Sequence, residues 1–219
     1  MTALAAQRVT KRFGGLTALD DVSVELRPGE VHGLIGPNGS GKTTMLNLLS
    51  GFYQADTGQV LLRGEDLTRA SVQRRARGGV ARTFQKPRLL GTLTVLENAM
   101  LGAWRETPRR LLPSLLSWPG IRGDERRNRA RAAEVLESLG LGYALDRRAN
   151  LLEHAEKRFL EIGRALMLRP DFILLDEPAG GLTGPEIERL GIVIRALRDA
   201  GIGVLLVEHH TEFVFGLCD

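Results

Sequence analysis

The residues with the clearest chemical potential lie together in the stretch GPNGSGKT, which spans residues 36–43. It fits the pattern G-x-x-x-x-G-K-[ST], whose glycines let the backbone curl so that successive N–H groups point inward at phosphate oxygens. The members of this candidate phosphate loop are Gly36, Pro37, Asn38, Gly39, Ser40, Gly41, Lys42 and Thr43, followed by Thr44. We expect Lys42 to bridge the β and γ phosphates of a nucleotide and the Thr43 hydroxyl to ligate Mg²⁺.

A pair of carboxylates, Asp176 and Glu177, follows the apolar run at 172–175. Open α/β sheets bind their ligands at the carboxyl ends of the strands, where such a pair would lie. The pattern predicts that Asp176 holds Mg²⁺ through water and that Glu177 polarises the water that attacks the γ phosphate. Acidic pairs are common in turns, so this prediction depends on the phosphate loop in the same chain.

Glu208 and His209 directly follow the strand pattern at 202–207, which would bring His209 to the same edge of the sheet. There the imidazole could hydrogen-bond the γ phosphate and report whether it is present. We expect structural roles for the two other histidines considered, His32 within an apolar strand and His154.

The surrounding elements alternate in type. Period-2 or continuous apolar patterns predict strands, and period-3.6 patterns predict helices. Strands are predicted at 22–26, 31–35, 59–62, 80–84, 172–175 and 202–207, and helices at 42–50, 124–139 and 185–200, with a break rich in proline and glycine at 108–123. Apolar strands alternating with helices at both ends of the chain favour a mostly parallel sheet, and the helical middle is typical of an inserted subdomain.

Composition narrows the class of protein. The chain has 219 residues, 43% of them hydrophobic and 26% charged, and a single cysteine, Cys218, which excludes an internal disulfide framework. No apolar run approaches the length of a membrane span, and residues 1–8 lack the apolar core of a signal peptide. We therefore expect a soluble, cytoplasmic protein.

The net charge of +4 hides an uneven distribution. Residues 69–131 contain 15 basic and 4 acidic side chains, a net charge of +11, against −7 for the remainder. Such a region could meet nucleic acid, acidic lipid or an acidic protein surface, or it could be a solvated helix face, above all at 122–131. Because tyrosine and tryptophan are not interleaved with the arginines, nucleic acid is the weaker candidate, and we expect none as a partner.

Taken in order, these motifs resemble the ATP-binding cassette (ABC) family, the nucleotide-hydrolysing subunits of membrane transporters. Phe13 resembles the aromatic residue that stacks on adenine, and Gln85 the glutamine that touches Mg²⁺ and the attacking water. Gly181, Leu182 and Thr183 occupy the place of the loop that crosses the dimer interface, and His209 that of the switch histidine. The resemblance implies ATP and Mg²⁺ as cofactors, with Glu177, His209 and Gln85 catalytic.

The implied fold is α/β: a P-loop NTPase core with a mainly parallel sheet, an N-terminal antiparallel β portion and an inserted α-helical subdomain. We expect residues 1–85 to form the first part of the core, 86–167 the helical subdomain, and 168–219 the second part of the core. Family members continue into a further strand, so we also expect the chain to be truncated at its C-terminus.

Four phrases resemble the ATPases of branched-chain amino-acid importers, whose close relatives serve urea and short amides. They are residues 13–19, 81–85, 93–98 and 216–219. The resemblance implies transmembrane permease subunits as partners, indirectly a solute-binding protein, and a peripheral place on the inner face of the cell membrane.

The family signature, of Leu-Ser-x-Gly-Gln type, departs from its usual form at residues 152–156. Glu153 replaces the serine and Ala155 the glycine. In the family these residues complete the ATP site of the partner cassette. We therefore expect a second, distinct ABC ATPase subunit and a heterodimer.

Two other classes of function remain open. One is a phosphate-loop kinase or GTPase, although the chain has no Asn-Lys-x-Asp sequence to read guanine. The other is a non-transport ABC ATPase that acts on nucleic acid or protein, which the basic middle would permit.

Overall fold

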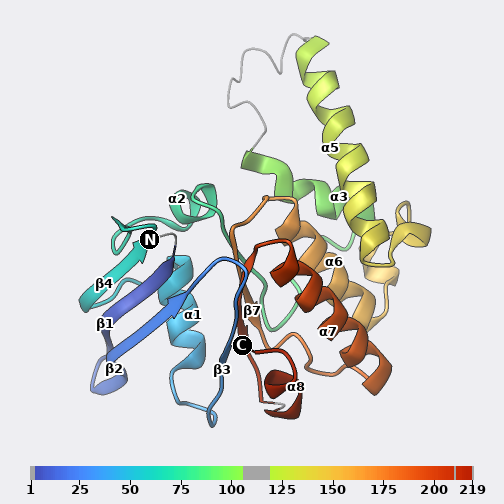
Figure 1. Ribbon diagram of the computed structural model, residues 1–219. Coiled ribbons are helices and arrows are strands. Elements are labelled where there is room, and N and C mark those ends of the chain that lie inside the picture. Colours follow the sequence, from blue (N-terminus) through green and yellow to red (C-terminus); the bar gives the residue numbers. More distant parts are fainter. Residues whose placement is uncertain (1–2, 106–118, 210, 219) are drawn as a thin grey trace. The chain divides into compact units, whose positions relative to one another are not determined.

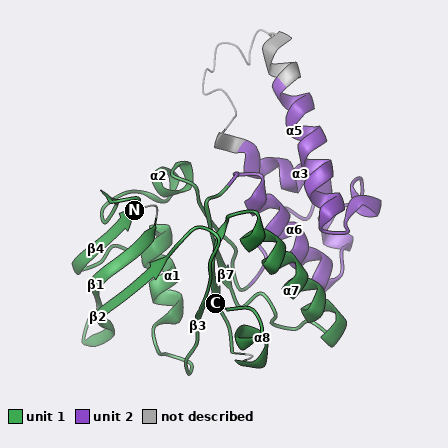
Figure 2. Ribbon diagram, in the orientation of Figure 1, with its two compact units in different colours: residues 1–85, 170–219 green, residues 86–169 purple. Residues whose placement is uncertain are grey.

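The structure, a computed structural model, describes residues 3–105, 119–209 and 211–218 (Figure 1). The chain divides into two compact units (Figure 2). The first, green in Figure 2, comprises Met1–Gln85 and Pro170–Asp219 and carries both sheets, whereas the second, purple, comprises Lys86–Arg169 and is built from helices.

An antiparallel sheet forms the N-terminal part of the first unit. Its strands are β1 (Leu4–Phe13), β2 (Leu16–Leu26), β4 (Thr57–Leu62) and β5 (Glu65–Asp66), in the order β2-β1-β4-β5. Strand β1 was not predicted, because its pairing with β2 shifts register three times between Ala6 and Arg12 and Arg8 has a φ of 50°. These irregularities interrupt the period-2 pattern by which a strand is predicted.

The second sheet of this unit is parallel, as the sequence predicted. Its strands are β3 (Val31–Leu34), β6 (Val80–Arg82), β7 (Phe172–Asp176) and β8 (Gly203–Val207), in the order β3-β8-β7-β6. Every residue of β7 and β8 is buried, which explains why both read as continuous apolar runs rather than as alternating ones. The carboxyl ends of β3, β7 and β8 therefore lie side by side.

The described part of the first unit contains four helices: α1 (Lys42–Ser50), α2 (Val72–Arg77), α7 (Gly184–Asp199) and α8 (Thr211–Phe215). One buried apolar cluster joins Met45 and Leu46 of α1 to Leu26 of the antiparallel sheet and to Leu174 and Leu205 of the parallel sheet. Both sheets thus hold α1 in place, and with it the phosphate loop that leads into this helix.

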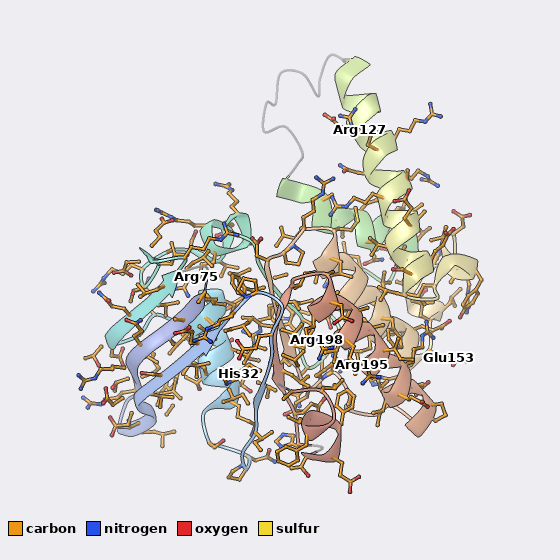
Figure 3. The ribbon with its side chains drawn as sticks, viewed as in Figure 1. His32, Arg75, Arg127, Glu153, Arg195 and Arg198 are labelled. Atoms are coloured by element: carbon orange, nitrogen blue, oxygen red, sulfur yellow. The ribbon has the colours of Figure 1, made fainter. Side chains whose placement is uncertain are left out.

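Arg75 of α2 lies buried at the other end of α1 (Figure 3). Its guanidinium donates to the carbonyls of Leu48 and Leu49, and to that of Leu67 at 2.6 Å. The bonds to Leu48 and Leu49 reinforce the last turn of α1, where the C-cap N–H of Gly51 also donates to the carbonyl of Leu48 at 3.2 Å. Burial lowers the pKa of Arg75 to about 10, still well above neutral pH, so the side chain is a buried cation under ordinary conditions.

The second unit contains α3 (Val95–Met100), α5 (Pro119–Ser138) and α6 (His154–Leu166), with short 3₁₀ turns at Leu101–Arg105, Gly142–Ala144 and Ala149–Leu151. Helix α5 begins five residues before its predicted start, at a proline, the residue type favoured in a first turn. Most of the predicted break at 108–123 lies outside the described residues. No helix in the described ranges combines the length and the apolarity that crossing a membrane requires.

Helix α5 carries part of the basic region, and several of its charges have partners. Arg127 pairs with Asp124, and Arg129 lies 3.9 Å from Asp146. Arg131 donates to the carbonyl of Met167 at 2.9 Å, just after the end of α6. Part of the positive charge counted in the sequence is therefore neutralised within the second unit.

Candidate active site

The candidate phosphate loop connects β3 to α1, the position that its motif predicts. Gly39 and Gly41 have φ angles of 81° and 90°, in the left-handed region that favours glycine. A Cβ atom on Gly41 would lie 2.5 Å from the carbonyl oxygen of Ala18, so this position excludes any side chain. The loop conformation therefore depends on glycine for both backbone angle and close approach.

Lys42 is buried at the start of α1 and turns back over the loop. Its ammonium group donates to the carbonyl of Gly36 at 2.7 Å and to that of Pro37 at 2.8 Å. Thr43 beside it is exposed. The loop thus presents a cation and a hydroxyl at a helix N-terminus, an arrangement suited to a phosphate group.

A pocket of about 290 Å³ lies over this loop. Its lining includes Phe13, Thr17, Lys42, Thr43 and Glu177, and also the predicted Asn38, Gly39, Gly41 and Thr44. One pocket therefore brings together a predicted adenine-stacking ring, the predicted phosphate ligands and the predicted catalytic carboxylate, although these are distant in the sequence.

Phe13 is 41% exposed and has neighbours that orient its ring. Tyr53 packs against it edge to face, with ring centroids 5.2 Å apart, and the ammonium of Lys11 lies 5.5 Å from its centroid. Lys11 is fixed in turn by Asp56 at 2.8 Å. A ring held in this way retains exposed surface on which a base can stack.

Asp176 and Glu177 lie at the end of β7 in different environments. Asp176 is buried, with 4% of its surface exposed, and pairs with Arg82 at 3.0 Å. Glu177 has a φ of 47°, which is uncommon for a residue with a side chain, and its backbone N–H donates to the carbonyl of Val207 at 2.9 Å. The turn thereby directs consecutive carboxylates to different partners.

The Glu177 carboxylate is engaged at both oxygens. The amide of Gln85 donates to Oε2 at 2.7 Å, and Nε2 of His209 lies 2.8 Å from Oε1. The structure thus brings together the three residues predicted to be catalytic, from the ends of three separate segments of the first unit.

The donor chemistry of the predicted metal ligands fits Mg²⁺. Thr43, Gln85 and Asp176 offer hydroxyl, amide and carboxylate oxygens, the hard ligands that this ion prefers. The described residues contain no group of three or more His, Cys, Asp or Glu side chains able to hold a metal ion by themselves. Such a set suits an ion that also takes ligands from phosphate and water.

The altered signature opens α6 in the second unit, where Glu153 is the N-cap residue (Figure 3). Its backbone N–H donates to Oε2 of Glu156 at 2.6 Å, and Glu156 also accepts from the hydroxyl of Tyr143. Burial acts to raise the pKa of Glu156, but these hydrogen bonds and the charges of Arg147 and Lys157 outweigh it and lower this pKa. A well-formed helix start therefore bears two carboxylates.

Loop 181–183 leads into α7, with Gly181 at a φ of 77° and the backbone N–H of Thr183 donating to Glu186 at 2.7 Å. His32, predicted to be structural, is half-buried, with Nδ1 3.7 Å from Oε1 of Glu30. His154 is an exposed residue in the first turn of α6.

Sequence reasoning assigned no role to two polar residues that contact this region, Arg82 and Glu208. Arg82 lies within the phrase 81–85, and a charged residue at the end of an apolar strand is a signal in itself. Glu208 is 1% exposed, and its carboxylate accepts the backbone N–H of Ala179 at 2.6 Å and that of His209 at 3.1 Å. It therefore joins the loop after Glu177 to the segment that carries His209.

Comparison with known proteins agrees with this geometry. The family model described as "ABC transporter" matches residues 19–180. The high-affinity branched-chain amino acid transport ATP-binding protein LivG of Escherichia coli is 40% identical over 99% of this chain and 85% of its own length. The corresponding protein BraF of Pseudomonas aeruginosa is 39% identical over the same shares.

A solved structure agrees as well. The ADP conformation of an ATP-binding cassette of an ABC transporter is similar with a TM-score of 0.83 and 34% identity, over 100% of this chain and 85% of the other. Identity and coverage at these levels leave no doubt about ancestry or fold. The chain belongs to the ABC transporter family, as an ATP-binding cassette that hydrolyses ATP.

Proposed function

We propose that this protein is the ATP-hydrolysing subunit of an importer for branched-chain amino acids. The observation that carries the proposal is the match of LivG and BraF over nearly the whole chain, joined to the site in which Gln85, Glu177 and His209 meet. The sequence phrases that resemble such importers support the same solute class.

In the proposed mechanism, Phe13 stacks on the adenine of ATP while the phosphate loop surrounds the phosphates. Lys42 exchanges its contacts with the loop carbonyls for contacts with the β and γ phosphates. Thr43, Gln85 and Asp176 would hold Mg²⁺, which supplies neutralisation of phosphate charge when it is bound.

Glu177 accepts a proton from the attacking water as the water oxygen bonds to the γ phosphorus and the bond to the β–γ bridging oxygen breaks. Because an ionised carboxylate only accepts hydrogen bonds, its contacts imply an amide N–H from Gln85 and an N–H at Nε2 of His209. We infer that both donors orient the carboxylate, and that His209 moves to the γ phosphate when ATP is present.

The proposed assembly contains permease subunits, a solute-binding protein that reaches the permease from the other side, and a second, distinct cassette. Glu153 and Glu156 support the heterodimer, because the signature of this chain would bring negative charge to the partner's γ phosphate. Two like charges about 4 Å apart repel by about 4 kcal/mol at an effective dielectric constant near 20. Through the permease, the protein would be peripheral to the inner face of the cell membrane.

The proposal is tested by co-expressing the chain with the permease subunits encoded in its own genome and measuring ATPase activity in proteoliposomes. We expect leucine with its binding protein to stimulate hydrolysis, and urea, acetamide and DNA to have no effect. A matched preparation carrying Glu177→Gln should show no stimulation. Stimulation by urea alone would assign the protein to the importers of short amides instead.

A further inference from the structure

Arg82 is a nearly buried cation at the end of β6, with 7% of its side chain exposed. One guanidinium nitrogen lies 3.0 Å from Oδ2 of Asp176, whose side chain is 5% exposed. Burying both charges is costly, and an apolar pair of similar volume would pack at this position without that cost. The ion pair therefore calls for an explanation other than stability.

The other Arg82 contacts join it to α1. Its second terminal nitrogen lies 2.5 Å from Oδ1 of Asn47 and 3.0 Å from the hydroxyl of Ser50. Its guanidinium carbon lies 5.1 Å from the ring centroid of Phe84 and 5.5 Å from that of Phe52. The guanidinium group is therefore held on several sides. Because it bonds both α1 and Asp176, it also fixes the position of Asp176 relative to α1.

These contacts bear on the two elements that carry proposed metal ligands. Thr43 lies in the first turn of α1, and Asp176 ends β7. Magnesium requires nearly ideal octahedral geometry with short ligand distances, so a small displacement of one ligand-bearing element against the other would weaken its binding. Residues that orient metal ligands without touching the metal commonly determine its affinity.

We propose that Arg82 is a positioning residue for Mg²⁺: by bonding both α1 and Asp176, it fixes the Asp176 carboxylate relative to Thr43. The ion pair also engages one carboxylate oxygen, so a metal or a metal-bound water meets Asp176 through the other. This inference rests on the proposed function, because it presupposes that the site takes ATP with Mg²⁺.

Arg75 provides a matched control. It is also a buried arginine of the first unit and also bonds α1, through the carbonyls of Leu48 and Leu49, but its other hydrogen bonds go to the carbonyls of Leu67 and Thr68 rather than to a proposed metal ligand. An effect that comes only from losing a buried arginine against α1 should therefore occur equally in Arg75→Met and Arg82→Met.

The experiment measures ATP affinity by titration calorimetry, once with excess Mg²⁺ and once with EDTA, for the wild-type protein and each variant. The dissociation constant in EDTA divided by the dissociation constant with Mg²⁺ gives the factor by which the metal strengthens ATP binding. We expect Arg82→Met to reduce this ratio by about 10- to 100-fold, the usual effect of removing a residue that orients a metal ligand, with little change in EDTA. Arg75→Met should leave the ratio as in the wild type.

Asn47→Ala is a milder second variant, which keeps the ion pair but removes one bond to α1. We expect it to reduce the ratio in the same direction and by less, and it keeps the test decisive if Arg82→Met does not fold. Equal losses with and without metal in the Arg82 variant, or an unchanged ratio in the variants that fold, would overturn the positioning role. A wild-type protein that does not distinguish ATP with Mg²⁺ from ATP alone would instead contradict the proposed metal site.

Discussion

Nε2 of His209 lies 2.8 Å from Oε1 of Glu177, and the backbone N–H of Glu177 donates to the carbonyl of Val207 at 2.9 Å. Val207 precedes His209 by two residues, so one strand end contacts Glu177 through both main chain and side chain. Any movement of His209 towards a phosphate must therefore break a bond to the carboxylate while the backbone bond keeps Glu177 in place. Under the proposed function, the movement by which His209 senses the nucleotide would also release the carboxylate of Glu177.

Glu177→Gln should separate binding from catalysis. The amide keeps the shape of the side chain but is a far weaker base, so we expect ATP to bind while turnover falls by about 10² to 10⁴ in the assembled transporter. Single-turnover hydrolysis and calorimetry measure the two quantities. Glu188→Gln, at an exposed position on α7, is the control and should leave both unchanged. Hydrolysis at the native rate by the Glu177 variant would assign the water-orienting role to another group.

Lys42→Ala should weaken binding of ATP with Mg²⁺ by well over tenfold, since a charge-assisted contact contributes about 1.5 to 3 kcal/mol. The loss of binding energy should be smaller than that of a complete ion pair. Lys42 must first give up its hydrogen bonds to two loop carbonyls before it can contact the nucleotide. Titration calorimetry measures the affinity, with Lys157→Ala as a control that removes a lysine from α6 instead. Unchanged affinity in the Lys42 variant would contradict the assignment of the phosphate loop.

The altered signature predicts a poor ATPase when this chain pairs with itself. Glu153→Ser with Ala155→Gly removes one carboxylate and a methyl group, so we expect higher ATPase activity of the isolated protein at matched concentration. Adding Glu177→Gln to this double variant should abolish the gain, which shows that hydrolysis occurs at this chain's own site. Robust activity of the unmodified homodimer, or no gain despite intact dimerisation, would contradict the role given to Glu153.

The helix start itself should survive that substitution. Glu156 remains to accept the N–H of residue 153, and serine is a favoured N-cap residue. A thermal unfolding curve of the double variant close to that of the wild type would separate the effect on activity from an effect on folding.

The basic surface of α5 should matter for assembly rather than for nucleotide binding. We expect charge reversal at Arg126 and Arg129, and at Arg122, whose side chain lies outside the described residues, to reduce co-purification with the permease. Rim charges act mainly on association, so ATP affinity should change by less than about twofold. If charge reversal lowered ATP affinity more than co-purification with the permease, these arginines would belong to an ordinary solvated helix face. Arg127, which pairs with Asp124 on the same helix, is an example of such a residue.

The sequence predicted those parts of the fold whose patterns are regular. The buried runs of β7 and β8 and the helix α1 were predicted to within a residue, because uniform burial or a helical period determines them. Strand β1 was missed because its register against β2 shifts three times. These shifts interrupt the alternation of apolar and polar residues by which a strand is predicted from sequence. Site motifs were easier to predict, because their glycines and charges are needed at fixed spacings.

Contacts between separate motifs could not be predicted in this way. No spacing along the chain indicates that Arg82 meets Asp176 or that Glu208 accepts the N–H of Ala179, because these pairs form only when the strands lie side by side. Tertiary packing creates such contacts, and a single sequence carries no record of them.

At Glu177, selection for a stable fold and selection for the carboxylate favour different residues. Glycine or asparagine would adopt a φ of 47° with less strain than glutamate, so the fold alone does not favour the residue found there. Replacement of Glu177 by glycine or asparagine would relieve this local strain while removing the carboxylate, and under the proposed function it would leave a subunit that folds and joins the transporter without hydrolysing ATP. Quality control that recognises unfolded chains would pass such a subunit, and it would act as a dominant inhibitor by displacing active copies from the transporter.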